Sequence, residues 1–152
     1  MHILIIGGTR NMGLALAGSL LASGHRVTIL NRGKTPDSLP DEIERLRADR
    51  TDPAQLEAAL AGRRFDAVVD MVLYKGDEAE AITRLLAGRV GHYLFISTGQ
   101  VYLVRQGLER PFHEDDYEGR LMPAPKENSY GYPEWLYGKE KRDAEDTLAR
   151  AW

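Results

Sequence analysis

The chain has 152 residues, of which 43% are hydrophobic and 28% are charged, and its net charge is −3. This composition is typical of one globular domain with its own core, and it argues against a general nucleic-acid binder, which usually carries a basic patch. There is no cysteine, so neither a disulfide nor a thiolate metal site can form. The four histidines show no metal-ligand spacing, and we predict no metal site. The N-terminus enters an apolar segment without a basic leader, and no apolar run approaches the ~20 residues of a membrane span, so we expect a cytoplasmic protein.

Short apolar segments alternate with amphipathic, Ala/Leu-rich segments along the chain. Strands are predicted over residues 2–6, 25–30, 43–48, 65–72 and 92–98, and helices over 11–23, 52–61, 77–90 and 134–152. The third strand is the weakest of these. Alternation with short connections predicts right-handed βαβ units, and therefore an α/β fold with a doubly wound parallel sheet.

The second predicted helix has a clear start signal. Asp52 is expected to cap it, Pro53 suits its first position, and Gln55 is expected to complete a capping box. By contrast, residues 103–134 break the alternation with prolines and with the acidic cluster 114–116. Long ordered loops in compact domains are usually functional, although the acidic cluster itself is more typical of a solvated loop than of substrate ligands.

A glycine-rich turn separates the first predicted strand from the first helix. It reads Gly7-Gly8-Thr9-Arg10-Asn11-Met12-Gly13. In a βαβ unit, such glycines let the backbone approach a pyrophosphate, which then lies at the helix N-terminus. We therefore predict a dinucleotide site, with a plain tight turn as the alternative. No Gly-Lys-Ser/Thr follows, which excludes a P-loop.

The end of the second strand indicates which dinucleotide is bound. An acid there binds the adenosine ribose, but this chain has Asn31 followed by Arg32. An arginine can pair with a 2′-phosphate through two hydrogen bonds, and Arg10 could face the same phosphate. We therefore expect NADP in preference to NAD; the alternative is that both arginines are solvated surface charges.

Tyr137 and Lys141 are four residues apart on the last predicted helix, so they share one face with their Cβ atoms ~6 Å apart. This helix follows the fifth strand, where its side chains could reach a cofactor at the carboxyl ends of the strands. The pair is therefore a candidate catalytic site.

The sequence resembles the extended and atypical branch of the short-chain dehydrogenase/reductase superfamily, the NAD(P)-dependent epimerase/dehydratase-like proteins. The glycine turn resembles that of members that begin with Gly-Gly-Thr-Arg, in which Arg10 stands where other members have a glycine. Three further segments carry the resemblance: 93–102, ending in a Ser/Thr-x-x-Val-Tyr motif, 111–116, and the Tyr-x-x-x-Lys motif of 137–141.

The resemblance implies a Rossmann-like fold and a catalytic set of Thr98, Tyr137 and Lys141. Thr98 would hydrogen-bond the reacting oxygen, with Ser97 a weaker candidate, Tyr137 would be the acid–base, and Lys141 would activate it and hold the nicotinamide ribose. A free tyrosine has a pKa of ~10, so catalysis near neutrality requires nearby positive charge.

The resemblance also assigns two single residues to the cofactor. Asp49 would touch adenine, or else be a polar residue at a helix entry, and Met71 would line the nicotinamide side, or else pack in the core. The expected cofactor-binding set is Gly7, Gly8, Thr9, Arg10, Asn11, Met12, Gly13, Asn31, Arg32, Asp49, Met71, Tyr137 and Lys141.

Members of this branch are longer, so we interpret residues 1–152 as a dinucleotide-binding domain that is truncated within the catalytic helix, without the later strands and the substrate region. The fifth strand would then be an unprotected edge, and this form by itself is expected to self-associate, bind dinucleotide weakly and be inactive. The expected substrate is a sugar or sugar nucleotide, acted on by an epimerase, dehydratase or reductase. Two alternatives are an RNA-binding relative and a non-catalytic NADP-sensing regulator. Family members commonly dimerise through the helices that flank the fifth strand, so a homodimer is possible.

Overall fold

The computed structural model describes residues 1–151, which divide into two compact units. The sheet unit comprises Met1–Leu73 and Ala81–Ile96. The C-terminal unit comprises Tyr74–Glu80 and the described residues from Ser97 onward. Each unit is described by itself below.

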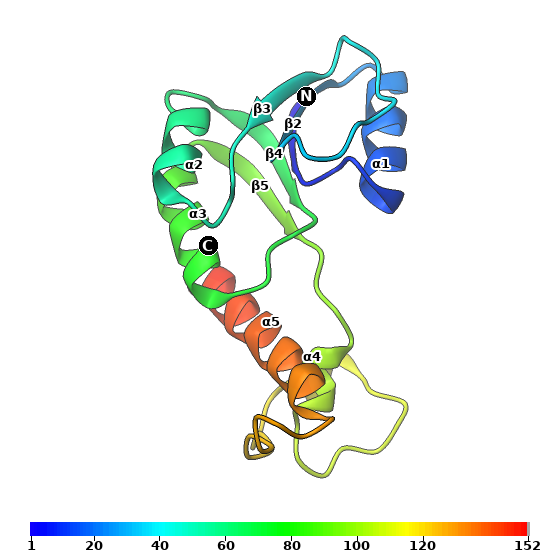
Figure 1. Ribbon diagram of the computed structural model, residues 1–152, viewed down its shortest axis with the longest axis vertical. Coiled ribbons are helices and arrows are strands. Elements are labelled where there is room, and N and C mark those ends of the chain that lie inside the picture. Colours follow the sequence, from blue (N-terminus) through cyan, green and yellow to red (C-terminus); the bar gives the residue numbers. More distant parts are fainter. Residues whose placement is uncertain (152) are drawn as a thin grey trace. The chain divides into compact units, whose positions relative to one another are not determined.

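The sheet unit is built on five parallel strands in the order β3-β2-β1-β4-β5 (Figure 1). The strands are β1 His2–Ile6, β2 Arg26–Asn31, β3 Glu44–Arg47, β4 Phe65–Asp70 and β5 Val90–Phe95. The chain moves outward from β1 through β2 to β3 and then continues on the other side of β1 with β4 and β5. This reversal confirms the predicted doubly wound sheet, and such folds bind ligands at the carboxyl ends of the strands beside the reversal.

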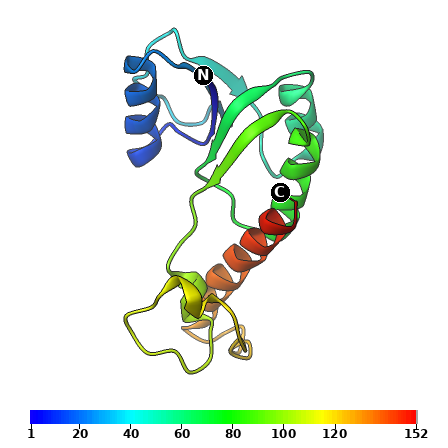
Figure 2. The same cartoon turned by 180° about the vertical axis from the view of Figure 1, so that it is seen from behind.

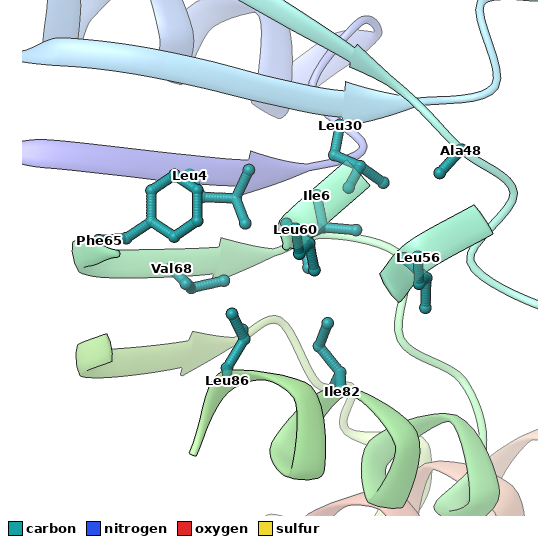
Figure 3. Close-up of a cluster of buried hydrophobic side chains, with 10 residues drawn as sticks. All are labelled: Leu4, Ile6, Leu30, Ala48, Leu56, Leu60, Phe65, Val68, Ile82 and Leu86. Carbon is teal, nitrogen blue, oxygen red and sulfur yellow. The ribbon is translucent and has the colours of Figure 1, made fainter. Parts of the chain in front are cut away.

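Helices cover both faces of this sheet (Figure 2). They are α1 Asn11–Ala22 on one face, and α2 Pro53–Leu60 with the sheet-unit residues of α3 Gly76–Leu86 on the other. Alternate residues of β1 face opposite ways: Leu4 and Ile6 pack with α2 and α3, whereas Ile5 packs with α1. Figure 3 shows the larger of the two cores, in which the side chains of α2 and α3 meet those of the strands. Because both faces are buried, the central strands are nearly continuous apolar runs.

Several predicted boundaries were wrong, and the conformation of Gly88 explains two of them. The helix predicted to reach residue 90 ends at Leu86, because Gly88 adopts a φ of +65° that closes the helix. Val90 then pairs with Phe65, so β5 begins earlier than predicted and ends at Phe95. Thr98 therefore lies in the connection after β5 and not in the strand. The end of β4 was also predicted too late: the strand ends at Asp70 instead of residue 72.

The start of α2 is partly as predicted. Asp52 caps the helix, since its carboxylate accepts hydrogen bonds from the backbone N–H groups of Ala54 (3.0 Å) and Gln55 (3.1 Å). The capping box was wrong. The backbone N–H of Asp52 donates to the carbonyl of Asp49 (3.1 Å), so the side chain of Gln55 accepts from the N–H of Asp49 (3.0 Å) instead.

The C-terminal unit contains three helical elements besides the start of α3. They are α4 Gln100–Leu103, the 3-10 helix η1 Glu114–Tyr117 and α5 Tyr132–Ala151. Helices α4 and α5 pack closely at Gly138, where an added Cβ would lie 2.5 Å from the carbonyl oxygen of Gln100. Of the helices within residues 1–151, none has the length and apolar character needed to cross a membrane.

The connection between α4 and α5 is held at several points. The backbone N–H of Gln106 donates to the carbonyl oxygen of Arg120 (2.9 Å), and the N–H of Met122 donates to the carbonyl oxygen of Val104 (2.8 Å). The buried guanidinium of Arg142 lies 3.6 Å above the ring of Tyr117 and donates to the carbonyl oxygen of Tyr117 (2.6 Å). The connection is therefore an ordered part of the unit.

Candidate active site

The glycine turn adopts a backbone that side chains would obstruct. Gly7 and Gly8 have φ values of +97° and +87°, a region that disfavours residues with a Cβ. A Cβ on Gly13 would lie 2.5 Å from Cα and 3.0 Å from N of Gly8. These three glycines therefore let the first turn of α1 sit directly against the end of β1.

The N-terminus of α1 is open. Arg10 occupies the N-cap position without a side-chain cap, and the first turn contains no acidic residue. Asn11 has a φ of +45°, which asparagine tolerates better than most residues. Among the other predicted residues of the turn, Thr9 is half-buried, and the side chain of Met12 is 66% exposed. The backbone N–H groups at the start of a helix and the positive end of its dipole suit a phosphate.

Met71 lies beside this turn. Its backbone N–H donates to the carbonyl of Ile6 (3.0 Å), and its Cβ would be 3.2 Å from a Cβ on Gly7. The residue is also partly buried against the core on the α1 side of the sheet. The structure thus brings Met71 and the glycine turn together in the sheet unit.

The predicted cations near the end of β2 have protein partners. Arg10 donates to the hydroxyl of Thr35 (2.9 Å), and Arg32 lies 3.9 Å from the carboxylate of Asp49. Hydrogen bonds from the backbone and the side chain of Thr51, together with Arg32, lower the pKa of Asp49. Arg32 and Asp49 are therefore neighbours, as a shared binding site for the adenosine end of a cofactor requires.

Arg47 is a cation at this edge that the sequence reasoning missed. It is the last residue of β3, opposite Asn31 in the strand register, and its guanidinium donates to the Asn31 side-chain oxygen. The same oxygen accepts from the N–H of Gly33 (2.7 Å), whereas Nδ2 of Asn31 is buried with no hydrogen-bond partner within residues 1–151. Parallel strands end at one edge of a sheet, so the charged end of the third strand was an available signal.

All three predicted catalytic residues belong to the C-terminal unit. Tyr137 and Lys141 lie on α5, and Lys141 is only 2% exposed. Thr98 lies between β5 and α4, where its Oγ1 accepts from the N–H of Gln100 (3.3 Å). Oγ of Ser97 is buried and has no hydrogen-bond partner among the described residues, so the weaker of the two predicted hydroxyls is the one left free.

Thr98 lines an open groove of about 790 Å³ in the C-terminal unit. The lining residues are Thr98, Gly99, Gln100, Leu103, Arg110, Pro111 and Phe112. Phe112 stacks on Tyr102 at 5.8 Å, and the guanidinium carbon of Arg110 is 5.7 Å from the Phe112 ring centroid. The groove thus combines a hydroxyl, an aromatic wall and a cation, a combination that the sequence did not reveal.

The acidic cluster beside this groove makes hydrogen bonds within its own loop. Glu114 accepts a hydrogen bond from the hydroxyl of Tyr102 (3.2 Å), and Asp116 accepts from the backbone N–H of His113 (2.8 Å). Burial is the main cause that raises the pKa of Tyr102, and the charge of Glu114 adds to it. These carboxylates shape the loop around Tyr102.

The strand order and the glycine turn define a Rossmann-type α/β fold. The chain belongs to the NAD dependent epimerase/dehydratase family, whose sequence profile matches residues 3–135.

Two curated relatives are similar to the chain. The 2'-dehydrokanamycin reductase of Streptomyces kanamyceticus is 31% identical over 152 residues, which cover 100% of this chain and 39% of the relative. The chloroplast stem-loop binding protein of 41 kDa b of Arabidopsis thaliana is 35% identical over 127 residues, which cover 75% of this chain and 33% of the relative. The chain therefore spans well under half the length of these relatives.

Among solved structures, UDP-glucose 4-epimerase from Bifidobacterium longum, in complex with NAD+ and UDP, has a TM-score of 0.70 at 18% identity. The match covers 99% of this chain and 48% of the epimerase. At this identity the similarity supports the fold alone.

Proposed function

We propose that the protein is an NAD(P)-dependent enzyme of the epimerase, dehydratase or reductase type that acts on a sugar or sugar nucleotide through Thr98, Tyr137 and Lys141. The observation that carries the proposal is the buried Lys141 one helical turn after Tyr137, in the same compact unit as the groove that Thr98 lines. A lysine so deeply buried is uncommon unless it has a specific role or partner.

Each residue has a distinct part in this chemistry. Tyr137 takes a proton from a substrate hydroxyl during oxidation and returns one to the carbonyl oxygen during reduction. The ammonium of Lys141 stabilises the tyrosine anion, since an opposite charge nearby favours the charged form. Thr98 hydrogen-bonds the reacting oxygen. When bound, the dinucleotide supplies hydride transfer.

The sheet unit would hold the cofactor. The glycine turn and the open end of α1 suit its pyrophosphate, Asp49 its adenine, and Met71 the nicotinamide side. Arg10, Arg32 and Arg47 favour NADP, because a cationic rim suits a 2′-phosphate. The buried, unpartnered Nδ2 of Asn31 supports a ligand at this rim, since buried amide groups are seldom left without a partner.

The residues that line the groove favour an anionic substrate such as a sugar nucleotide. Among the described residues Arg110 makes no ion pair, and its guanidinium lies over the Phe112 ring. A guanidinium can bind a diphosphate through paired hydrogen bonds, and Phe112 offers an apolar surface to a sugar or base.

The test of the catalytic assignment is Tyr137→Phe in the full chain. NADP and NAD binding, measured by calorimetry, should be unchanged within about twofold, because only one hydroxyl is removed. Turnover of UDP-galactose or UDP-glucose, measured by chromatography of the products, should be lost, since general acid–base catalysis contributes roughly 10²–10⁴-fold. Full turnover by Tyr137→Phe, or a wild-type chain that binds neither dinucleotide, would show that the assignment is wrong.

The cofactor preference is tested with Arg47→Ala and Arg32→Ala. Each should weaken NADP binding about tenfold, as expected for loss of a charge-assisted hydrogen bond, and leave NAD binding unchanged. Arg26→Ala is the matched control, because Arg26 is exposed at the other end of the neighbouring strand β2. Equal affinity of the wild-type chain for NAD and NADP would contradict the preference.

A further inference from the structure

Tyr74 is the feature of the C-terminal unit that the proposed chemistry leaves unexplained. It begins the segment Tyr74–Glu80, which belongs to this unit although it precedes β5 in sequence. Its backbone N–H donates to the carboxylate of Glu78 (3.1 Å), which fixes the entry to α3. The position of Tyr74 is therefore set by local structure.

The segment is also attached to α5 beyond Tyr74. Lys75 forms an ion pair with Glu140 at 3.5 Å. A Cβ on Gly76 would lie 3.3 Å from the Cβ of Asp143, so the backbone of the segment runs close against the helix. Both contacts hold the segment against the part of α5 that carries Lys141.

The ring of Tyr74 contacts both members of the predicted pair on α5. Its centroid is 4.9 Å from Nζ of Lys141, within the ~6 Å range of a cation–π interaction. It is 6.3 Å from the ring centroid of Tyr137 at an interplanar angle of 50°, within the ~4.5–7 Å range of aromatic pairs. One side chain thus links the acid–base candidate and the lysine.

The burial of Lys141 gives this contact its importance. Its exposed fraction is 2%, and removing an ammonium from water disfavours the charged form unless other groups compensate. The face of an aromatic ring is negative and attracts a cation, and the attraction increases when the cation is desolvated. The face of an aromatic ring beside this buried ammonium would therefore favour its charged form.

Two carboxylates of α5 near Lys141 are each paired with another lysine. Glu140 is paired with Lys75, and Asp143 accepts from Nζ of Lys139 (2.7 Å). On the other side of α5, Arg142 lies over Tyr117.

We propose that Tyr74 is a positioning residue whose ring face holds the Lys141 ammonium, in its charged form, beside Tyr137. The proposal rests on the proposed catalytic role of Lys141, whereas the contact itself can be tested without a substrate. The hydroxyl of Tyr74 has no part in this role, so phenylalanine should replace it and leucine should not. A role in packing alone would instead be satisfied by an apolar side chain of similar reach.

The decisive measurement is the titration of Lys141 in the full chain. Lysine labelled with carbon-13 at Cε is followed by NMR against pH, and the Lys141 signal is assigned by its loss in Lys141→Arg. The pKa of Lys141 should fall in Tyr74→Leu, because the ring face is lost while an apolar cover remains. It should be unchanged in Tyr74→Phe and should not fall in Tyr74→Trp, since tryptophan is the strongest partner for a cation. Tyr130→Leu is the control, because Tyr130 is 94% exposed.

Turnover provides the second readout. In Tyr74→Leu, kcat should fall about tenfold, as expected for the loss of a desolvated cation–π contact, and Tyr74→Phe should restore it. The dinucleotide affinity should change less than kcat, because most of the expected cofactor contacts lie in the sheet unit.

Three results would overturn the proposal: an unchanged Lys141 titration in Tyr74→Leu, a Tyr74→Phe variant that behaves like Tyr74→Leu, or a fall in the Lys141 pKa in Tyr74→Trp. If Tyr74→Leu does not fold, as judged by circular dichroism, the comparison of Tyr74→Phe and Tyr74→Trp with wild type decides. A shifted Lys141 titration combined with full turnover in Tyr137→Phe would refute the proposed function but leave the contact between Tyr74 and Lys141 established.

Discussion

The candidate binding surfaces of the two units differ in the atoms that form them. In the sheet unit, the surface offered to a phosphate is backbone, exposed because Gly7, Gly8 and Gly13 carry no side chains. In the C-terminal unit, the surface is made of side chains, with Tyr74 and Tyr137 beside the buried Lys141. Adding a side chain should damage the backbone surface of the sheet unit, whereas removing side-chain atoms should damage the surface of the C-terminal unit. Substitutions that separate these two sensitivities test the comparison.

The largest effect is expected for Gly13→Ala in α1. The new Cβ would meet backbone atoms of Gly8 at 2.5 Å and 3.0 Å, and no flexible side chain can move aside. We expect a loss of about 4 kcal/mol in unfolding free energy, the range of severe single substitutions, and no measurable dinucleotide binding. Gly18→Ala in the same helix is the control: nothing lies within 4 Å of its Cβ, so it should stabilise by about 0.5–1 kcal/mol. Urea unfolding and calorimetry measure both; similar values for the two variants would contradict the prediction.

A smaller but still large effect is expected for Asp70→Asn, which tests the buried ion pair of Asp70 with Arg50 in the sheet unit. The fully buried carboxylate accepts hydrogen bonds from Nη1 of Arg50 (2.7 and 2.9 Å), the hydroxyl of Tyr93 (2.6 Å) and the N–H of Val72 (3.0 Å). Burial raises the pKa of Tyr93 well above its ordinary value, and the charge of Asp70 adds to the rise. The network links the residue after Asp49 to the residue after Met71, so it holds two predicted cofactor contacts.

Removing one partner of a buried ion pair costs about 3 kcal/mol or more, so Asp70→Asn should lower the unfolding free energy by this amount. Asp66→Asn is the matched control on the same strand, because Asp66 is exposed and accepts from the N–H of His2 (2.6 Å). Its cost should be about 1 kcal/mol or less. Equal costs in thermal or urea unfolding would show that the Asp70 network does not hold this part of the sheet unit.

The smallest expected effect concerns the loop between β2 and β3. Arg45 donates to the carboxylate of Asp37 (2.8 Å) and to the carbonyl of Leu39 (2.7 Å). The hydrogen bond from Arg45 is the main cause that lowers the pKa of Asp37, and burial opposes it. A lowered folded-state pKa means that the ionised carboxylate stabilises the fold above its unfolded-state pKa, and that this stability is lost as the pH falls through the folded-state value.

Asp37→Asn should therefore cost about 1–2 kcal/mol at neutral pH, the worth of a hydrogen bond to a charged group, and progressively less at acidic pH. Urea unfolding of the wild type and the variant at several pH values measures this difference. A difference that is independent of pH would show that the carboxylate charge is not responsible.

Local patterns were sufficient for much of the fold. The apolar runs and the glycine turn predicted the parallel sheet and the start of α1, because each signal lies within a few consecutive residues. The Tyr137–Lys141 spacing likewise follows from helix geometry alone. The errors arose where the conformation of a single residue sets the boundary of an element. The start of β5, for example, depends on the conformation of Gly88.

The parts of the candidate sites that were missed depend on contacts between distant residues. Tyr74 meets α5 across many intervening residues, and Arg47 reaches Asn31 only because β2 and β3 pair in this register. Arg110 joins Thr98 in one groove through the fold of the loop after α4. None of these contacts has a periodic or local signature in the sequence.

The contacts of Arg142 with Tyr117 have a consequence for how the connection between α4 and α5 is cleaved. These contacts and the backbone hydrogen bonds of Gln106 and Met122 divide the long loop into two shorter ones. We call residues 106–120, which these bonds hold in place, the tied part. The cost of closing a loop rises only slowly with its length, so the division matters less for stability than for access. A protease needs a local stretch of chain that it can unfold, and residues 123–131, with Tyr130 exposed to 94%, offer one. Limited proteolysis of the native chain should therefore begin within residues 123–131 and reach the tied part only later.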